Sequence, residues 1–478
     1  MIDKSEIMDF SREFGLTANV IEKDYVLGWV LAGIFHHAEI GSSWVFKGGT
    51  CLKKCYFETY RFSEDLDFTL PESSNLNQEF LIKCFEEITE WVYDAAGIEI
   101  PKDVIRFDVY ENNRGGRSAQ GRIGYSGPMK KRGDLPRIKL DLTTDETLVL
   151  DPAEREVHHP YSDLPDKGIK IRCYCFEEVF AEKIRALAER ERPRDLYDVV
   201  HLYRHGELKP DQPLIFDTLE KKCKFKEMPV PTMETFRNSP EREELESEWK
   251  NMLAHQLPAL PSFEQFWKEL PEVMEWLHGA AQKALKEEIP LVGKVTIDET
   301  WRPPSMAQAW HTAVPLEKIR FAAANRLCVN LYYKNSYRLI EPYSLRRTRE
   351  GNIVLFAVRH NTDKPRSYRV DRIQGAEVTD TPFVPKHAIE LTPSGPISAP
   401  ALTRKSSGFP SSRPNQKRPT VKRSTTRKPS VGPKHVFQCT VCGKHFTRKE
   451  YNAILKSHKN KQGYPCPGRT GIFVKTKY

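Results

Sequence analysis

The chain has 478 residues and a net charge of +9, a length that suggests several domains. It contains no run of 18 apolar residues, and its first ten residues lack the apolar segment of a signal peptide, so we expect a cytoplasmic protein with no membrane partner. The charge is uneven along the chain. The last 78 residues carry +18 and the first 400 carry −9, which predicts a basic tail that binds polyanions.

The ten cysteines do not form the spacing pattern of a disulfide framework, which fits a reducing compartment. Cys173 and Cys175 alternate on a predicted strand, and we expect them to be small buried apolar side chains.

The segment 46–70, FKGGTCLKKCYFETYRFSEDLDFTL, carries the strongest functional signal. A Gly-Gly-Thr turn at 48–50 allows the backbone to approach a phosphate closely. Asp65 and Asp67 alternate with apolar residues, so both carboxylates are expected on one face of a strand. Neighbouring carboxylates repel one another unless a cation lies between them, and Mg²⁺ binds both carboxylates and substrate phosphates. The pattern therefore predicts a magnesium site for phosphoryl or nucleotidyl transfer.

A third carboxylate is expected beside this pair. In residues 136–143 apolar side chains alternate with Lys139, Asp141 and Thr143, which places Asp141 on the polar face of a predicted strand. If that strand lies next to the Asp-x-Asp strand, Asp141 could be a metal ligand or the general base for an attacking hydroxyl.

The glycine turn, the Asp-x-Asp strand and the later aspartate strand resemble the DNA polymerase β-like nucleotidyltransferase superfamily. Four flanking blocks resemble, more specifically, the AbiEii family, which comprises the nucleotidyltransferase toxins of bacterial abortive-infection and toxin–antitoxin systems. In chain order the blocks are EKDY at 22–25, RFSEDLD at 61–67, FAEKIR at 180–185 and PRDLYD at 193–198. The resemblance extends over about the first 205 residues.

Two predicted helices carry the last two blocks. Residues 176–190 have an apolar stripe at helical spacing, and Lys183 lies at its edge, where its ammonium needs an anionic partner. A proline begins the second helix, with Asp195 in its first turn and Asp198 on the same face. The resemblance implies that Lys183, Asp195, Asp198 and Arg194 belong to the active site.

Each feature also has a purely structural interpretation. A Gly-Gly-Thr sequence is usually only a turn, and an Asp-x-Asp pair is often a solvated strand face. Lys183 could extend its ammonium to solvent, and Asp195 could be only a helix cap. Their occurrence in one order over about 150 residues favours the functional interpretation.

The resemblance implies a Mg²⁺-dependent toxin that transfers NMP from an NTP to the 3′ hydroxyl of an RNA, with tRNA as the acceptor and with a cognate antitoxin. Asp65 and Asp67 would hold the metal. The catalytic residues expected are Asp65, Asp67, Asp141, Lys183 and Asp195. The residues expected at the nucleotide are Gly48, Gly49, Thr50, Ser63, Lys183, Arg194 and Asp198. Two alternatives stay open: a phosphotransferase toxin, and a nucleic-acid-binding regulator whose transferase domain is inert.

The fold class expected is α+β with several domains. Residues 1–300 are assigned to the nucleotidyltransferase domain, with a helical second half in which 226–260 could be partly extended. Short strands then follow one another. They resemble a WYL domain, a small SH3-like β-barrel, assigned to 301–391, although LFA stands at 355–357 in place of the name-giving Trp-Tyr-Leu. The expected strands are 327–333, 337–343, 353–358 and 367–373, and the expected ligand-facing cluster is Arg338, Arg369 and Arg372.

Residues 392–434 are rich in Pro, Ser, Thr, Lys and Arg and are expected to form a flexible basic linker. The final segment, 435–478, is expected to be a zinc-finger-like module. Its expected Zn²⁺ ligands are Cys439, Cys442, His458 and Cys466, with His445 as a possible substitute. Basic residues interleaved with Phe446 and Tyr451 suit nucleic acid, and a protein-docking finger is the alternative. These basic residues are Lys444, Arg448, Lys449, Lys456 and Lys459.

Overall fold

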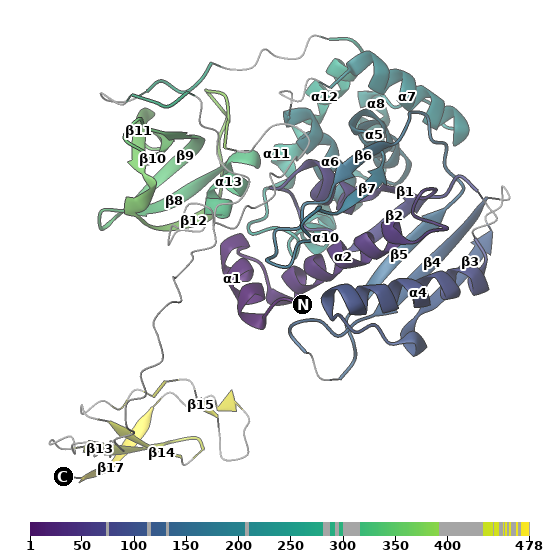
Figure 1. Cartoon of the computed structure of the whole chain (residues 1–478). Helices are drawn as coiled ribbons and strands as arrows, with labels where there is room; N and C mark the ends of the chain where they lie inside the picture. Colours follow the sequence, from purple (N-terminus) through teal and green to yellow (C-terminus); the bar gives the residue numbers. More distant parts are fainter. Residues whose placement is uncertain are drawn as a thin grey trace, which may run out of the picture. The chain divides into compact units, whose positions relative to one another are not determined.

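The computed structural model divides the chain into two compact units, Met1–Arg404 and Lys405–Tyr478, each described by itself (Figure 1). The expected linker up to residue 433 and the boundary at 300 lie outside the described residues. In the part of the chain that is described, no helix is long and apolar enough to cross a membrane. The described residues are 1–391, except 73–75, 112–115, 131–132, 206–209, 281–286, 292–295 and 300–315, and 434–477, except 443, 449–452, 454, 457, 460–464 and 467–469.

A seven-stranded mixed sheet organises the first unit, with the strand order β3-β4-β5-β2-β1-β7-β6. β2 pairs in parallel with β5 and β1 in parallel with β7, and the remaining neighbours are antiparallel. The strands are β1 (Val45–Lys47), β2 (Asp65–Thr69), β3 (Arg106–Glu111), β4 (Arg117–Gly124), β5 (Arg137–Thr143), β6 (Ala153–Glu156) and β7 (Lys170–Cys173).

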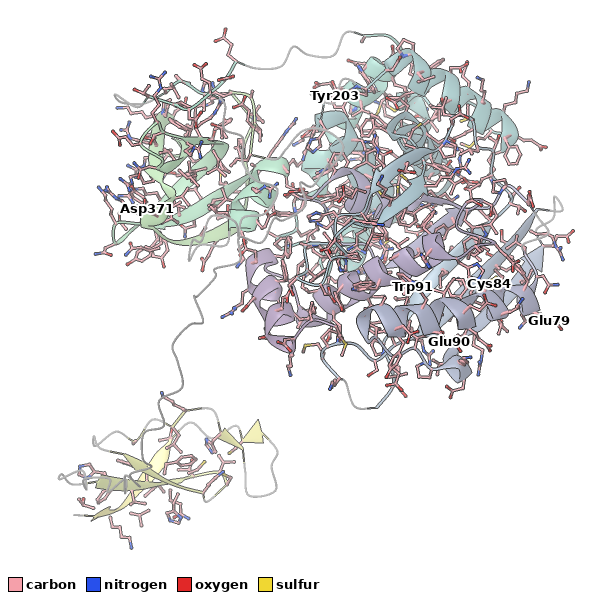
Figure 2. All side chains as sticks on the ribbon, in the orientation of Figure 1. Glu79, Cys84, Glu90, Trp91, Tyr203 and Asp371 are labelled. Atoms are coloured by element: carbon pink, nitrogen blue, oxygen red, sulfur yellow. The ribbon has the colours of Figure 1, made fainter. Side chains whose placement is uncertain are left out.

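Helices α2 (Ala18–His36) and α4 (Gln78–Ala96) lie side by side against this sheet (Figure 1). α2 is apolar on most of its circumference, and most of its residues are accordingly buried. A Cβ at Gly33 would come within 2.9 Å of Ile88 Cγ2, so the glycine allows the two helices to pack closely. Trp91, labelled on α4 in Figure 2, stacks on His36 of α2 with ring centroids 4.8 Å apart.

The EKDY block lies in α2, and each of its four side chains binds a different segment. Lys23 forms an ion pair with Glu64, directly before the Asp-x-Asp strand, and Asp24 forms a fully buried pair with Lys54. The block therefore connects α2 to four other segments of the unit, two of which, at Lys54 and Glu64, follow the glycine turn. The four contacts are Glu22 Oε1 with the Met129 amide (2.6 Å), Lys23 with Glu64 (2.8 Å), Asp24 with Lys54 (2.8 Å) and Tyr25 with Asp163 (2.7 Å).

The second half of this domain is helical, as predicted. The segment 226–260, which could be partly extended according to the sequence, contains three short helices. Their turns bury Phe236, Leu245 and Trp249 against the other helices. The other helices among the described residues up to 324 are α1 (Lys4–Phe14), α3 (Gly48–Cys51), the π-helix η1 (Leu52–Tyr56), the 3₁₀ helix η3 (Lys102–Val104), α5 (Phe176–Arg190), α6 (Pro193–Arg204), α7 (Gln212–Phe225), α8 (Met233–Arg237), α9 (Arg242–Ser247), α10 (Trp249–Leu253), α11 (Phe263–Trp267), α12 (Leu270–Leu277) and α13 (Leu316–Ala324).

A five-stranded antiparallel sheet follows α13, with the order β11-β10-β9-β8-β12. The prediction of a strand at 367–373 is wrong, because a 3₁₀ helix, η6 (Val370–Arg372), interrupts it. Val370 of this helix is buried. Asp371, labelled in Figure 2, accepts hydrogen bonds from Arg369. The last strand was not predicted. The strands are β8 (Leu327–Tyr333), β9 (Ser336–Arg347), β10 (Ile353–Arg359), β11 (Lys364–Arg369) and β12 (Ile373–Pro382).

Helix α13 joins this sheet to the loop that precedes β2. Arg320 is fully buried; its guanidinium pairs with Glu317 one turn earlier and lies 3.1 Å from Glu58 Oε2. The neighbouring Thr59 hydroxyl donates to Glu317 at 3.1 Å. Burial raises the pKa of Glu58 to about 7, although Arg320 opposes the rise. The arginine therefore neutralises carboxylates that have no access to water.

We expect Arg320→Met to lower the free energy of unfolding of the first unit by about 3–5 kcal/mol, because it leaves buried carboxylates without a counter-charge. All eight tryptophans precede residue 311, so denaturant unfolding followed by tryptophan fluorescence reports on this unit alone. The exposed Arg349→Met is the control, and Glu58→Gln in the Arg320→Met background should recover part of the loss. A loss below about 1 kcal/mol would contradict this account of the contact.

The second unit is built from short strands in the residues that are described. Phe437, Cys439, Leu455 and Cys466 form its small core. β13 lies between β14 and β17, and β15 pairs with β16. The strands are β13 (Lys434–Cys439), β14 (His445–Arg448), β15 (His458–Lys459), β16 (Pro465–Cys466) and β17 (Gly471–Lys477).

Candidate active site and metal centres

Three carboxylates lie on one face of the seven-stranded sheet. Asp67 on β2 lies opposite Asp141 on β5 and opposite Lys47 on β1. Asp65 lies two residues earlier on the same face of β2, while the intervening Leu66 is fully buried. The expected strand and its neighbour are confirmed, and their register places all three acidic side chains on the same face of adjacent strands.

The surroundings of Asp67 and Asp141 disfavour the ionised form of both carboxyl groups. Burial raises the pKa of Asp67 to about 6; Asp141 adds to the rise, while Lys47 and Lys183 oppose it. Burial also raises the pKa of Asp141, against a hydrogen bond from the Gln120 amide at 3.4 Å. The structure thus holds like charges together at a cost that a divalent cation would remove.

This raised pKa has a consequence for stability without metal. The pKa of Asp67 in the folded protein is about 6, above the ordinary value of about 3.9. The ionised carboxylate therefore lowers the free energy of unfolding at pH values above about 6. This cost disappears as the pH falls and the carboxyl group becomes protonated. In EDTA, we expect Asp67→Asn to raise the melting temperature of the first unit at pH 7.5 and to change it little at pH 4.5. An equal change at both pH values would contradict the assignment of the raised pKa to Asp67.

The glycine turn lies directly against these carboxylates. Gly48 has φ +81°, and a Cβ there would come within 2.1 Å of Asp67 Oδ2. Thr50 is buried, and its hydroxyl donates to the Asp65 carbonyl at 2.5 Å. Any side chain at Gly48 would displace the Asp67 carboxylate, so the turn and the acid form one site.

The second glycine leaves room for an arginine. A Cβ at Gly49 would lie 2.5 Å from Arg61 Nη2 and 3.1 Å from Ser63 Oγ. The expected nucleotide-binding residue Ser63 is thus adjacent to the turn. Arg61 was not singled out from the sequence, although it begins the RFSEDLD block.

Helices α5 and α6 contribute an ion cluster beside the turn, buried except for the exposed Arg190. Lys183 Nζ lies 2.7 Å from Asp198 Oδ2 and 3.2 Å from Asp195 Oδ1. Arg190 pairs with Asp195 at 2.8 Å, and Arg61 binds Asp198 through Nε and Nη2, both at 2.7 Å. Burial disfavours the charged form of Asp198, but Arg61 and Lys183 outweigh it and lower the carboxyl pKa. Three cations thus surround two anions, and the cluster carries one net positive charge.

Two further basic side chains lie close to the site. Lys47, which the sequence analysis did not assign, pairs with Glu146 at 2.9 Å. Arg194 is half-buried, and its Nε lies 3.5 Å from the Met252 carbonyl. Burial lowers the pKa of Arg194, as does the charge of Arg61, while Asp65 acts in the opposite direction. The structure therefore places Arg194 within the electrostatic influence of the carboxylates.

A second candidate centre lies in the C-terminal unit. The ligand atoms of Cys439, Cys442, His458 and Cys466 all lie within 4.8 Å of one another, so the expected Cys/His cluster is confirmed. Cys439 Sγ lies 3.8 Å from Cys466 Sγ, and Cys442 Sγ lies 3.3 Å from His458 Nε2. His445, the possible substitute, is exposed and outside the cluster. Three sulfurs and an imidazole are the donor set of a structural zinc site.

The expected arginine cluster of the WYL-like sheet is not formed. Arg338 lies opposite Leu331, and Arg369 lies opposite Val354; these two apolar residues belong to different cores, so the arginines lie on opposite faces of the sheet. Arg369 binds Asp371, and Arg372 is exposed. Arg372 lies in the 3₁₀ helix η6 and not in a strand, so it does not share a strand face with Arg338 or Arg369.

On the sheet face that carries Arg338, a different group of arginines lies near Tyr368. Burial raises the pKa of Tyr368, and the charges of Arg338, Arg359 and Arg366 oppose the rise. The Tyr368 hydroxyl is buried and finds no hydrogen-bond partner among the described residues. Arg338 also lies over the Tyr333 ring at 5.3 Å.

Comparison with known proteins gives two family matches. Residues 29–275 match the family described as nucleotidyl transferase AbiEii toxin, type IV toxin–antitoxin system, and residues 315–378 match the WYL domain. Among solved structures, MenT4, a nucleotidyltransferase toxin from Mycobacterium tuberculosis H37Rv, is similar at 17% sequence identity and a TM-score of 0.41, over 59% of this chain and 91% of that chain. No curated protein matches. The AbiEii match covers more than half of the sequence, and the chain belongs to this family of nucleotidyltransferase toxins and also carries a WYL domain.

Proposed function

We propose that this toxin is a Mg²⁺-dependent enzyme that transfers NMP from an NTP to the 3′ hydroxyl of an RNA, with tRNA as the acceptor. The observation that carries the proposal is the register of β2 and β5, which sets Asp67 opposite Asp141 beside a glycine turn with positive φ. A phosphate-binding turn next to an acidic face suits the transfer of a phosphorus centre.

The reaction is a substitution at the α-phosphorus of the NTP. The 3′ oxygen of the RNA forms a bond to this phosphorus, the bond to the bridging oxygen breaks, and pyrophosphate leaves. Asp141 would accept the proton of the attacking hydroxyl. Its raised pKa brings it closer to neutral pH, where a general base is more effective.

Asp65 and Asp67 would hold the magnesium. The donor set fits, because hard oxygen ligands suit Mg²⁺ and because burial and like charge raise the pKa of Asp67. When bound, the ion supplies positive charge against the charge that develops on the phosphoryl oxygens.

The triphosphate would lie against the turn, held by the amides of Gly48 and Gly49 and the hydroxyls of Thr50 and Ser63. The ion cluster supports this placement, because it carries one net positive charge and includes Lys183, whose charge acts on Asp67. In this proposal Asp195 and Asp198 position Lys183 and the arginines toward the nucleotide. Arg194 would add a further cation.

The remaining parts of the chain would regulate the transferase and bind nucleic acid. We assign the transferase to 1–300, the WYL barrel that senses a signal or partner to 301–391, and a basic linker to 392–434. The zinc-holding module at 435–478 would bind nucleic acid, which the net charge of +18 over the last 78 residues supports. The toxin family implies a cognate antitoxin.

The test is to incubate the purified full chain with Mg²⁺, each α-labelled NTP in turn and total bacterial tRNA. We expect label to enter RNA with one or a few nucleotides and only when the metal is present. Release of an NDP with label on another acceptor would favour the phosphotransferase alternative. Binding to DNA without consumption of any NTP would favour the regulator.

A further inference from the structure

Three cysteines converge in the core of the first unit, directly behind the glycine turn. Cys51 ends α3, Cys55 lies one helical turn later in η1, and Cys173 ends β7. All three are 0% exposed, and their sulfurs lie within 4.8 Å of one another. The fold brings them together because β1, which leads into the turn, pairs with β7 so that Phe46 lies opposite Cys173.

A buried cysteine is commonly just a small apolar side chain. Cys84 on α4, labelled in Figure 2, and Cys223 on α7 are buried in this way, and neither belongs to any group of converging ligands among the described residues. The group of three differs, because three polarisable sulfurs from two separate segments face one point. Such convergence needs specific backbone geometry, which apolar packing alone does not require.

A partly buried arginine accompanies the three sulfurs. The Arg155 guanidinium lies over the Tyr56 ring at 5.0 Å, and its Nε is buried with no hydrogen-bond partner in the described part of the chain. β6 pairs with β7 so that Ala153 lies opposite Cys173, and Arg155, two residues further along β6, therefore lies on the same face of the sheet as the Cys173 sulfur. Its guanidinium would be a counter-charge for thiolates there.

We propose that Cys51, Cys55 and Cys173 bind one zinc ion as three thiolates, with Arg155 as the counter-charge. Zn–S bonds of about 2.3 Å place neighbouring sulfurs about 3.8–4.0 Å apart, which the observed convergence accommodates. Binding releases three protons. A divalent ion with three thiolates leaves one negative charge, which the guanidinium balances, whereas a monovalent soft ion would leave one negative charge unbalanced.

This site is separate from the catalytic carboxylates and from the C-terminal cluster. The ion would cross-link β7 to the segment that follows the glycine turn, and so would restrict the movement of the turn. Because the site is fully buried, the ion would enter during folding and resist later removal. The inference does not depend on the proposed RNA transfer, and its test measures metal rather than activity.

The test is the zinc content of the full-length protein. The protein is produced in zinc-supplemented medium, and its metal content is measured by inductively coupled plasma mass spectrometry. The variant Cys439→Ala/Cys442→Ala removes the C-terminal cluster, and we expect one zinc per chain to remain. Adding Cys173→Ala should lower the content to zero, and adding Cys84→Ala instead should leave it at one. Circular dichroism checks that each variant folds.

X-ray absorption at the zinc edge of the Cys439→Ala/Cys442→Ala variant gives a second measurement that does not depend on Cys173→Ala folding. We expect three sulfur neighbours at about 2.3 Å. No zinc in this variant, a nitrogen-dominated ligand shell, or one zinc that survives Cys173→Ala in folded protein would each overturn the proposal. One equivalent of copper in place of zinc would overturn the charge argument.

Discussion

Asp67→Asn is expected to reduce nucleotide transfer by about 10³-fold or more while leaving the fold intact. The amide is isosteric with the carboxylate and preserves the close contact with Gly48, where a Cβ would lie 2.1 Å from Asp67 Oδ2. It removes one of the charges that would hold the metal and leaves the Asp141 carboxylate opposite it. The measurement is the initial rate of label transfer at saturating NTP, beside a thermal melt of the same preparation.

The matched control is Asp103→Asn, an exposed aspartate in the 3₁₀ helix η3. It should keep full activity and an unchanged melting temperature. If Asp67→Asn lost activity together with its fold, the substitution would say nothing about catalysis, and Asp65→Asn would take its place. A folded Asp67→Asn protein with near-normal activity would remove Asp67 from the metal site.

Removal of zinc from the C-terminal cluster is expected to unfold the second unit while the first stays folded. The core of this unit is small, and two of its members, Cys439 and Cys466, are themselves expected ligands. Structural zinc contributes an apparent binding free energy of about 10–16 kcal/mol in zinc-finger peptides, far more than such a core supplies. We therefore expect Cys442→Ser to make residues from 434 onward sensitive to protease.

The first unit provides the internal control. All the tryptophans of the chain lie in it, so the tryptophan unfolding curve of Cys442→Ser should coincide with that of the wild type. Cys175→Ser, at a half-buried cysteine outside both sulfur clusters, should leave the protease pattern unchanged. A C-terminal unit that stays protease-resistant in Cys442→Ser would show that it folds without the ion.

The sequence predicted the elements that carry the site because their periodicity is strong. Strict alternation around Asp65 and Asp67 identified β2, and a stripe at helical spacing identified α5. The alternation around Asp141 also identified β5, and the pairing of the two strands followed from placing polar faces together. Local patterns of this kind can be recognised in the sequence because their spacing matches the side-chain period of the helix or strand.

The contacts that organise the charges could not be predicted. Arg61 and Asp198 are 137 residues apart, and the pattern around each says only that it is polar. Their pairing depends on how α6 packs against the loop before β2. The break in the WYL-like strand at Val370 depended in a similar way on burial that no alternation reveals.

The thiol group shows the same limit. Cys173 alternates with Cys175 as an apolar residue would, and the sequence supported only that interpretation. The sulfurs that meet Cys173 come from the segment after β1, more than 100 residues earlier, through the parallel pairing of β1 with β7. Metal ligands at such separations have no spacing pattern to find.

The most direct test of the central claim compares two labels on the same nucleotide. The full chain, Mg²⁺ and tRNA are incubated with one NTP labelled at the α-phosphorus or at the γ-phosphorus, with Asp67→Asn in parallel. Transfer of NMP predicts that the α label enters RNA, that the γ label leaves in pyrophosphate, and that Asp67→Asn does neither. Entry of the γ label into any acceptor, with the α label retained in an NDP, would contradict nucleotidyl transfer.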